Sequence, residues 1–264
     1  MGKKIAIIGG GNLGVAIAEG LLKSKFSKAS ELIVTKRNTT PLKDLEKKGV
    51  YVTSDNTAAT RKSDVIIIAV KPFQVTEVLD GLKKELGSGK ILISVVTGVT
   101  TADMNELLKN KIAMFRAMPN TAIAIQESMT CICQVNANKI QIEYVEGLFR
   151  TLGKVVTIEE KLMEAATILG ACGTAYAMRY IRASIQGGIE IGFDATTASL
   201  VAAQTVKGAA ELLLQKGSHP EQEIDKVTTP RGCTIAGLNE MEHRGFSSSL
   251  IRGIVTSYQK IEKV

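Results

Sequence analysis

Three glycines near the N-terminus have the spacing of a phosphate-binding turn. Gly9, Gly11 and Gly14 follow the apolar run 5–8 at G-x-G-x-x-G intervals, and a helical pattern covers 13–22. The first glycine permits a tight turn, the second lets a diphosphate approach the backbone, and the third lets the helix pack on the strand. The first-turn N–H groups of that helix then face an anion. This order predicts dinucleotide binding; the alternative is a glycine-rich turn without a ligand.

A basic segment follows the next predicted strand, 31–35. About twenty residues after such a turn, NAD-binding proteins hold the ribose hydroxyls with an acidic residue. This chain has Thr35, Lys36, Arg37 and Asn38 there instead. A hydroxyl, two cations and an amide suit the 2′-phosphate of NADP, so we predict NADP as the cofactor, with NADPH preferred and NADH possible. The alternative is a solvated basic turn.

A second stretch with chemical potential covers 225–234. It holds several hydroxyls, a proline turn and Gly232, and helical spacing follows from Ile235. We expect Thr234 to be the N-cap of this helix, whose N-terminus would face an anion. From spacing alone, plain helix capping is an equally good interpretation.

The elements that must position these residues change character near Glu159. Before it, apolar runs alternate with helical spacing, which predicts an α/β, Rossmann-like doubly wound sheet over 1–159. After it, only helical spacing is present, so we predict an all-α domain over 160–264. Its stripes are rich in small residues and predict burial against a second subunit. The predicted strands are 5–8, 31–35, 51–53, 64–70, 91–95, 112–118, 129–134 and 154–158.

Composition narrows the function further. The net charge is +7, but no basic run exceeds three residues and aromatics are 4%, so we expect no nucleic-acid partner. No apolar run is long enough to span a membrane and no leader pattern is present, which predicts a cytoplasmic protein without a membrane partner. Cys131, Cys133, Cys172 and Cys233 lack metal-site spacing, so we interpret all four as packing residues and expect no metal.

These residues together resemble the pyrroline-5-carboxylate reductase family over essentially the whole chain. The resemblance is most specific over 227–246, which is similar to the sequence signature of the family. Two departures stand out: Gly170-Ala171-Cys172-Gly173-Thr174 replaces the usual serines and proline, and Arg231 stands where glycine is more common. The other segments that carry it are 7–14, 69–72, 94–100 and 116–121.

The resemblance implies an enzyme that reduces the C=N bond of 1-pyrroline-5-carboxylate with a hydride from NADPH or NADH, giving L-proline as the last step of proline biosynthesis. It implies helical domains that interlock into a homodimer, which in many members assembles further, with each site shared between two subunits. It implies cofactor contacts at Ile8, Gly9, Gly10, Gly11, Asn12, Leu13, Thr35, Asn56, Ala69, Val70, Lys71, Pro72, Val95, Val96 and Thr97, and substrate contacts at Asp225, Lys226, Gly232, Cys233 and Thr234.

The chemistry of such a reaction needs few acids or bases. Hydride addition to a protonated imine discharges a cation, so no oxyanion hole is required. The substrate carboxylate needs N–H donors, which 232–234 can supply, and the product amine needs one hydrogen-bond partner. The hydroxyl of Thr234 is our candidate for that partner and therefore the candidate catalytic residue.

Two other functions remain open at this point. A β-hydroxyacid dehydrogenase also joins a Rossmann domain to helices, but it needs a lysine base on the long helix, and no lysine lies between Lys161 and Lys207. A non-catalytic NADP sensor would keep the glycine turn, but it would not need the anion site predicted at 228–234.

Overall fold

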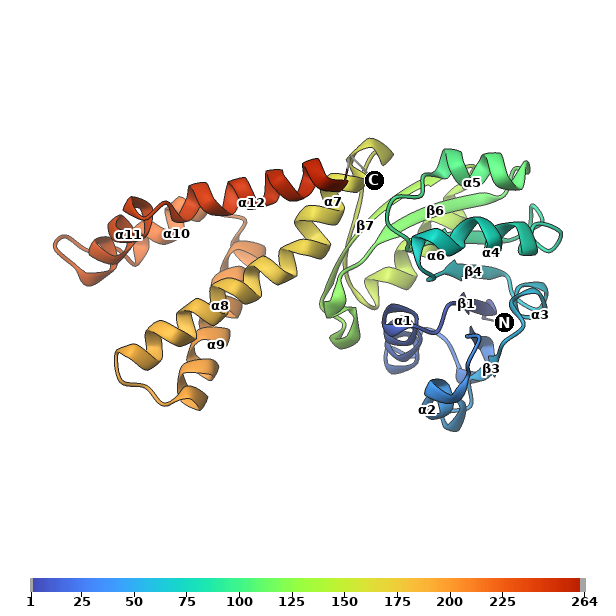
Figure 1. The fold of residues 1–264 in the computed structure, drawn as a ribbon, viewed down its shortest axis with the longest axis horizontal. Coiled ribbons are helices and arrows are strands. Elements are labelled where there is room, and N and C mark those ends of the chain that lie inside the picture. The colour runs from blue at the N-terminus through green and yellow to red at the C-terminus, as the bar shows by residue number, and fades with distance from the viewer. Residues whose placement is uncertain (1, 262–264) are drawn as a thin grey trace. The chain divides into compact units, whose positions relative to one another are not determined.

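The computed structural model describes residues 2–261, which form two units (Figure 1). The first unit runs to Cys172, and the second comprises Gly173–Lys260. The contacts assign segment 160–172 to the first unit, although the sequence pattern placed it with the helical domain. A physical reason is Arg116, which forms ion pairs with Glu160 and Glu164 at 3.1 Å each.

An eight-stranded sheet forms the centre of the first unit, in the order β3-β2-β1-β4-β5-β6-β7-β8. The first six strands are parallel, β7 is antiparallel to β6, and β8 is parallel to β7. Chain order reverses between β1 and β4, which is where doubly wound sheets open a ligand crevice. The strands are β1 Ile5–Ile8, β2 Leu32–Thr35, β3 Tyr51–Thr53, β4 Val65–Ile68, β5 Ile91–Ser94, β6 Ala113–Met118, β7 Ser128–Val135 and β8 Gly153–Thr157.

Helices cover both faces of this sheet, so the predicted Rossmann-like fold is confirmed. Alternate residues of a strand point to opposite faces. Ile5 and Ile7 therefore pack with α1 and α6, whereas Ala6 and Ile8 pack with α3, α4 and α5. The helices are α1 Asn12–Lys23, α2 Lys43–Lys47, α3 Asn56–Arg61, α4 Val75–Leu82, α5 Thr101–Leu108, α6 Lys139–Arg150 and α7 Met163–Ala166.

The sequence pattern predicts further helices in this unit at 41–48, 73–85, 101–108 and 140–152, but it does not predict α3. It is short, and its first residues are polar, so apolar periodicity does not reveal it. Its N-terminal signal is nevertheless present, because Asp55 accepts a hydrogen bond from the backbone N–H of Ala58 at 2.9 Å. Asp, Ser, Thr and Asn are the residues that favour this capping position.

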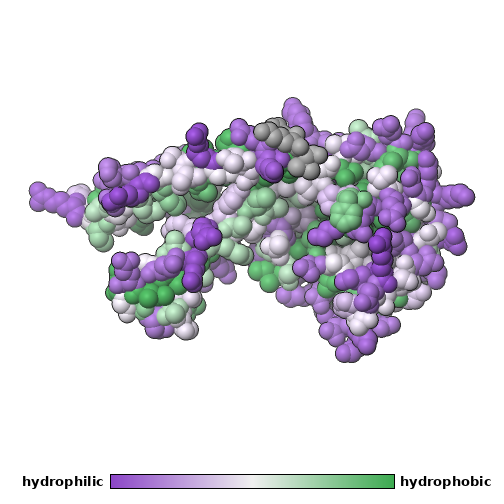
Figure 2. Space-filling view, in the orientation of Figure 1, coloured by the Kyte–Doolittle hydropathy of each residue, from purple (hydrophilic) through white to green (hydrophobic). Residues whose placement is uncertain are grey.

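The second unit is helical throughout, as predicted, but a single chain gives it almost no core. Ala198 and Ala202 are the only buried side chains in Gly173–Lys260. Met178 and Ile189, from the predicted apolar stripe, are 62% and 45% exposed. Figure 2 shows apolar side chains along the surface of these helices. They are α8 Gly173–Glu190, α9 Ala195–Lys216, α10 Pro220–Lys226, α11 Cys233–His243 and α12 Phe246–Ile261.

No helix within residues 2–261 combines the length and hydrophobicity needed to cross a membrane.

Candidate active site

A cavity of about 980 Å³ lies at the carboxyl ends of the strands of the first unit. Its size is in the range of ligand pockets. Loops after β1, β2, β4 and β5 contribute to its walls, so segments far apart in the sequence meet there. The predicted cofactor residues that line it are Gly9, Gly10, Gly11, Asn12, Leu13, Thr35, Lys36, Arg37, Asn56, Ala69, Val70, Lys71, Pro72, Val95, Val96 and Thr97.

The glycine turn has a different steric reason at each position. Gly9 has φ +113°, and a Cβ there would lie 2.5 Å from the carbonyl oxygen of Ala69. A Cβ at Gly14 would collide with the carbonyl oxygen of Gly9. A Cβ at Gly11 would meet no described atom within 4 Å, so its space is open toward a ligand. Gly11 is also the N-cap of α1 and offers no side chain to the first-turn N–H groups. The turn therefore fits a bound diphosphate.

Two of the predicted cofactor residues, Ile8 and Gly14, do not line the cavity. Ile8 is fully buried in the core beneath α3 and α4, and Gly14 is buried against Gly9. Conversely, α3, α4 and the residues just before them bring polar and apolar residues to the wall that the sequence analysis did not single out. Those residues are Ser54, Thr57, Gln74, Glu77, Val78, Gly81 and Leu82.

Thr35 lies at the inner wall of the cavity, and its backbone has a structural role. Thr35 is fully buried at the end of β2, and its hydroxyl has no hydrogen-bond partner among the described residues. The backbone carbonyl of Thr35 instead accepts the N–H groups of Gly9 and Gly10, at 3.2 and 2.6 Å. Thr35 therefore orients the glycine turn from the core side. The role that we expected for its hydroxyl at the 2′-phosphate stays a prediction, since Thr35 is among the residues that line the cavity.

The two predicted cations differ in their surroundings. Lys36 is half-buried and lines the cavity. Arg37 is 80% exposed, and its Nη2 lies 3.5 Å from Oε2 of Glu77, the acid in the first turn of α4. The ring of groups that would receive a 2′-phosphate therefore contains a carboxylate as well as two cations.

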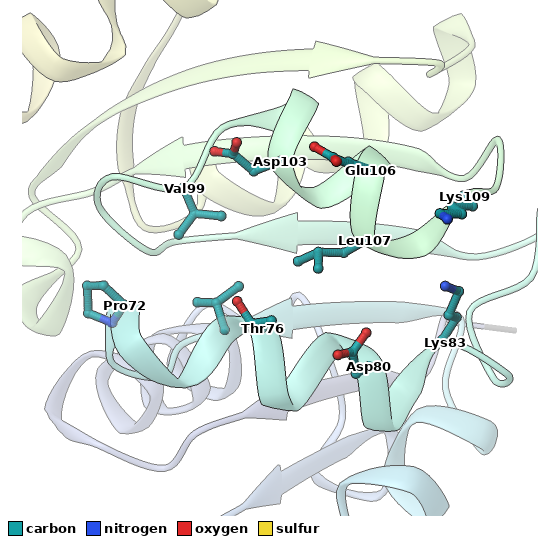
Figure 3. A pocket seen from close by; sticks show the side chains of 10 residues that line it. Pro72, Thr76, Asp80, Lys83, Val99, Asp103, Glu106, Leu107 and Lys109 are labelled. Carbon is teal, nitrogen blue, oxygen red and sulfur yellow. The ribbon is translucent and has the colours of Figure 1, made fainter.

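A second, smaller cavity of about 640 Å³ lies between α4 and α5 (Figure 3). Thr76 and Asp80 of α4 face Leu107 of α5 across it. Its rim carries both signs of charge, and it shares only Pro72 with the larger cavity. Nothing in its lining resembles a phosphate-binding turn.

The segment predicted to bind substrate lies in the second unit, between α10 and α11. Helix α11 begins at Cys233, and its N-cap is Gly232, with φ −73° and ψ 162°. Thr234 is therefore the second residue of the helix, and the prediction that it is the N-cap is wrong. The helix begins earlier than expected because the preceding loop is tight. Arg231 adopts φ +60°, and the N–H of Gly232 donates a hydrogen bond to the carbonyl of Thr229 at 2.9 Å.

This shift leaves the hydroxyl of Thr234 without a hydrogen-bond partner among the residues that the structure describes. Thr234 is half-buried, and no residue of 2–261 forms a hydrogen bond with its hydroxyl. Gly232 has no side chain with which to cap the helix, so the first-turn N–H groups around Cys233 and Thr234 also remain available. The segment therefore presents backbone donors and one hydroxyl side by side.

The other predicted substrate residues are all exposed or half-buried. Lys226 forms an ion pair with Glu223 at 2.5 Å, and hydrogen bonds from Lys226 and Ser218 lower the pKa of Glu223 to about 2. Glu223 also pairs with Lys216 at 3.7 Å, so its single negative charge is shared between two lysines. Asp225 is exposed and forms no ion pair with a described residue. Cys233 is exposed in the single chain, so its interpretation as a packing residue is wrong there.

The segment in which this chain departs from the resembled family adopts an unusual conformation. Thr167–Cys172 forms a π-helix between α7 and α8. The amide Nδ2 of Asn120 donates a hydrogen bond to the carbonyl of Gly170 at 3.2 Å, and its Oδ1 accepts one from the N–H of Ala122 at 3.0 Å. Wide turns of this kind bend helices without a proline. The end of β6 thus supports this turn and does not line the large cavity.

The four cysteines are free thiols, and within residues 2–261 no cluster of three or more His, Cys, Asp or Glu side chains could hold a metal ion.

Comparison with protein families covers both units. Residues 160–264 match the model for pyrroline-5-carboxylate reductase dimerisation. Residues 4–98 match the model for coenzyme F420-dependent NADP oxidoreductases, which agrees with the glycine turn and its cavity.

Individual relatives extend the similarity over nearly the whole chain. Pyrroline-5-carboxylate reductase 2 of Dictyostelium discoideum is 44% identical over 99% of this chain and 93% of its own length. Pyrroline-5-carboxylate reductase 1 of the same organism is 46% identical over 97% of this chain, but the chain spans only 49% of that relative. The crystal structure of Plasmodium falciparum pyrroline carboxylate reductase with NADP bound is 27% identical, with a TM-score of 0.90 over 99% of this chain and 97% of the other.

Proposed function

The chain belongs to the pyrroline-5-carboxylate reductase family, and we propose that it reduces 1-pyrroline-5-carboxylate to L-proline, the last step of proline biosynthesis, with NADPH as its preferred hydride donor. The observation that carries this proposal is 44% identity to a reductase of that name over both units. Membership of this family argues against a β-hydroxyacid dehydrogenase, and an activity assay separates a reductase from a non-catalytic NADP sensor.

The residues of the first unit fit a dinucleotide. The open space at Gly11 and the free N–H groups at the start of α1 would hold the diphosphate, and Lys36 and Arg37 would hold the 2′-phosphate. Val70, Pro72 and Thr97, at the strand ends, would support the nicotinamide side of the cofactor. The bound nicotinamide supplies the hydride, and the protein supplies position and electrostatics.

The residues of the second unit would hold the substrate. The N–H groups around Gly232–Thr234 would bind its carboxylate, and the hydroxyl of Thr234 would contact the ring nitrogen. Lys226 would act through its positive charge from a distance, because its ammonium group already donates a hydrogen bond to Glu223. An iminium substrate carries its own proton, so Thr234 would orient the ring and need not act as an acid.

A steady-state assay tests the proposed activity. It would follow oxidation of NADPH and of NADH with 1-pyrroline-5-carboxylate and with its six-membered homologue. We expect turnover with the five-membered ring and a higher kcat/KM with NADPH. Cofactor binding without turnover of either ring would contradict the proposal.

Arg37→Ala should raise the KM for NADPH about tenfold and leave that for NADH nearly unchanged. A charge-assisted hydrogen bond contributes about 1.5–3 kcal/mol, and solvent screening at this exposed site favours the lower end. The matched control is Arg61→Ala, because Arg61 is another exposed arginine of the first unit and does not line the cavity. Equal changes in KM for both cofactors would remove Arg37 from the phosphate site.

The protein should be an obligate homodimer. Ordering the helices of Gly173–Lys260 costs conformational entropy that two buried alanines do not offset, so their exposed apolar faces need a partner. Met178→Asp should therefore yield monomers and lose activity, whereas Ile140→Asp, on a helix of the first unit and 74% exposed, should not. Light scattering measures the mass, and an active monomer would refute this prediction.

The cytoplasmic location stays a prediction.

A further inference from the structure

One ion pair spans the candidate cofactor cleft. Arg37 follows β2, and Glu77 lies in the first turn of α4, which follows β4. Strands β2 and β4 flank β1, so the pair reaches across the glycine turn that follows β1. Both side chains line the same cavity, and their charged atoms are 3.5 Å apart.

Glu77 has an unusual place in this cavity. It is the only carboxylate among the described residues that line the wall, and the cations there are Lys36, Arg37 and Lys71. A carboxylate at this rim repels the phosphates of a dinucleotide. Its side chain is 75% exposed, so it is not retained to fill a core. The interaction that it makes is with the arginine expected to receive the 2′-phosphate.

We propose that Glu77 determines how strongly this chain distinguishes NADPH from NADH, by holding Arg37 in the free protein and competing with the 2′-phosphate for its guanidinium. The inference rests on the proposed cofactor site. NADH has no 2′-phosphate, so its binding does not require Arg37 to change partner. Glu77 therefore weakens the binding of NADPH selectively and brings the two affinities closer together.

Direct binding of NADPH and of NADH to the purified full-length protein, followed by cofactor fluorescence, tests this role without substrate. Glu77→Gln should lower the Kd for NADPH about three- to fivefold and change that for NADH less than twofold. An exposed ion pair contributes at most about 1 kcal/mol, which is about fivefold in an equilibrium constant. The control is Asp80→Asn, which removes one negative charge from the same helix but faces the cavity between α4 and α5.

A double-mutant comparison separates competition from simple repulsion. In an Arg37→Ala background, Glu77→Gln should change the Kd for NADPH less than twofold, because no guanidinium remains to be released. An equal gain in both backgrounds, an equal gain for both cofactors, weaker NADPH binding, or no change would each overturn the proposal. Lack of turnover by the unmodified enzyme would instead contradict the proposed activity and leave this binding test intact.

Discussion

An Arg116→Met variant should lose about 3 kcal/mol of unfolding free energy, at the lower end of what breaking a buried ion pair costs. The side chain of Arg116 is 2% exposed and holds Glu160 and Glu164 at 3.1 Å each. The side chains of Glu160 and Glu164 are 32% and 26% exposed, respectively, so water can partly replace the lost partner. Nε of Arg116 has no partner among the described residues, which also limits what the cluster contributes.

Urea denaturation followed by circular dichroism, at one fixed protein concentration, measures this loss. The matched control is Arg61→Met, which removes an arginine that is 66% exposed and pairs with Glu85 at 2.8 Å. An exposed pair contributes about 0–1 kcal/mol, so the control should remain near the parent protein. If the two variants were equally stable, Arg116 would not anchor segment 160–166.

The same cluster should make the enzyme sensitive to acid. Burial disfavours the charge of Glu160, but hydrogen bonds from the backbone and hydroxyl of Thr101, and then from Arg116, outweigh it and lower its pKa. A lowered pKa in the folded state means stability that is complete above the unfolded value, about 4.3, and is lost as the pH falls through the folded value. Glu160→Gln should remove this part of the acid dependence.

A Thr234→Ala variant should lose about ten- to a hundredfold in kcat/KM, the cost of one lost hydrogen bond to the substrate nitrogen at about 1.4 kcal/mol per decade. The structure makes this test cleaner, because Gly232 is the N-cap and the hydroxyl of Thr234 bonds no described residue. The variant should therefore keep its stability. Thr234→Ser should retain most activity because the hydroxyl survives.

A matched control exists at the same position of another helix. Thr196 is the second residue of α9, as Thr234 is of α11, and it is exposed. Thr196→Ala removes the same hydroxyl from the same helical position, in a first turn that Asp194 caps, and should leave kcat/KM unchanged. A larger loss at Thr234, about 10²–10⁴-fold, would instead indicate general acid catalysis. Unchanged kcat/KM in Thr234→Ala would assign the residue no role in the reaction.

Local sequence patterns were sufficient to predict most strands and helices of the first unit. Apolar runs such as 5–8 and 65–68 are too continuous for strands with a solvated face, and helical spacing lies between them, so a covered parallel sheet followed directly. The glycine turn was equally predictable because its steric demands fall within a few residues. An element without apolar periodicity, such as α3, was not predicted.

The sequence by itself determined the doubly wound sheet, the place of its ligand cleft and the helical character of the second half, because each depends on neighbours along the chain. Only the tertiary structure decided which groups face that cleft. It enclosed the hydroxyl of Thr35 and placed Glu77 opposite Arg37, because strand order brings β2 and β4 to either side of β1. It also buried Arg116 beside acids more than forty residues away. Such pairings depend on packing between distant segments, which no local period encodes.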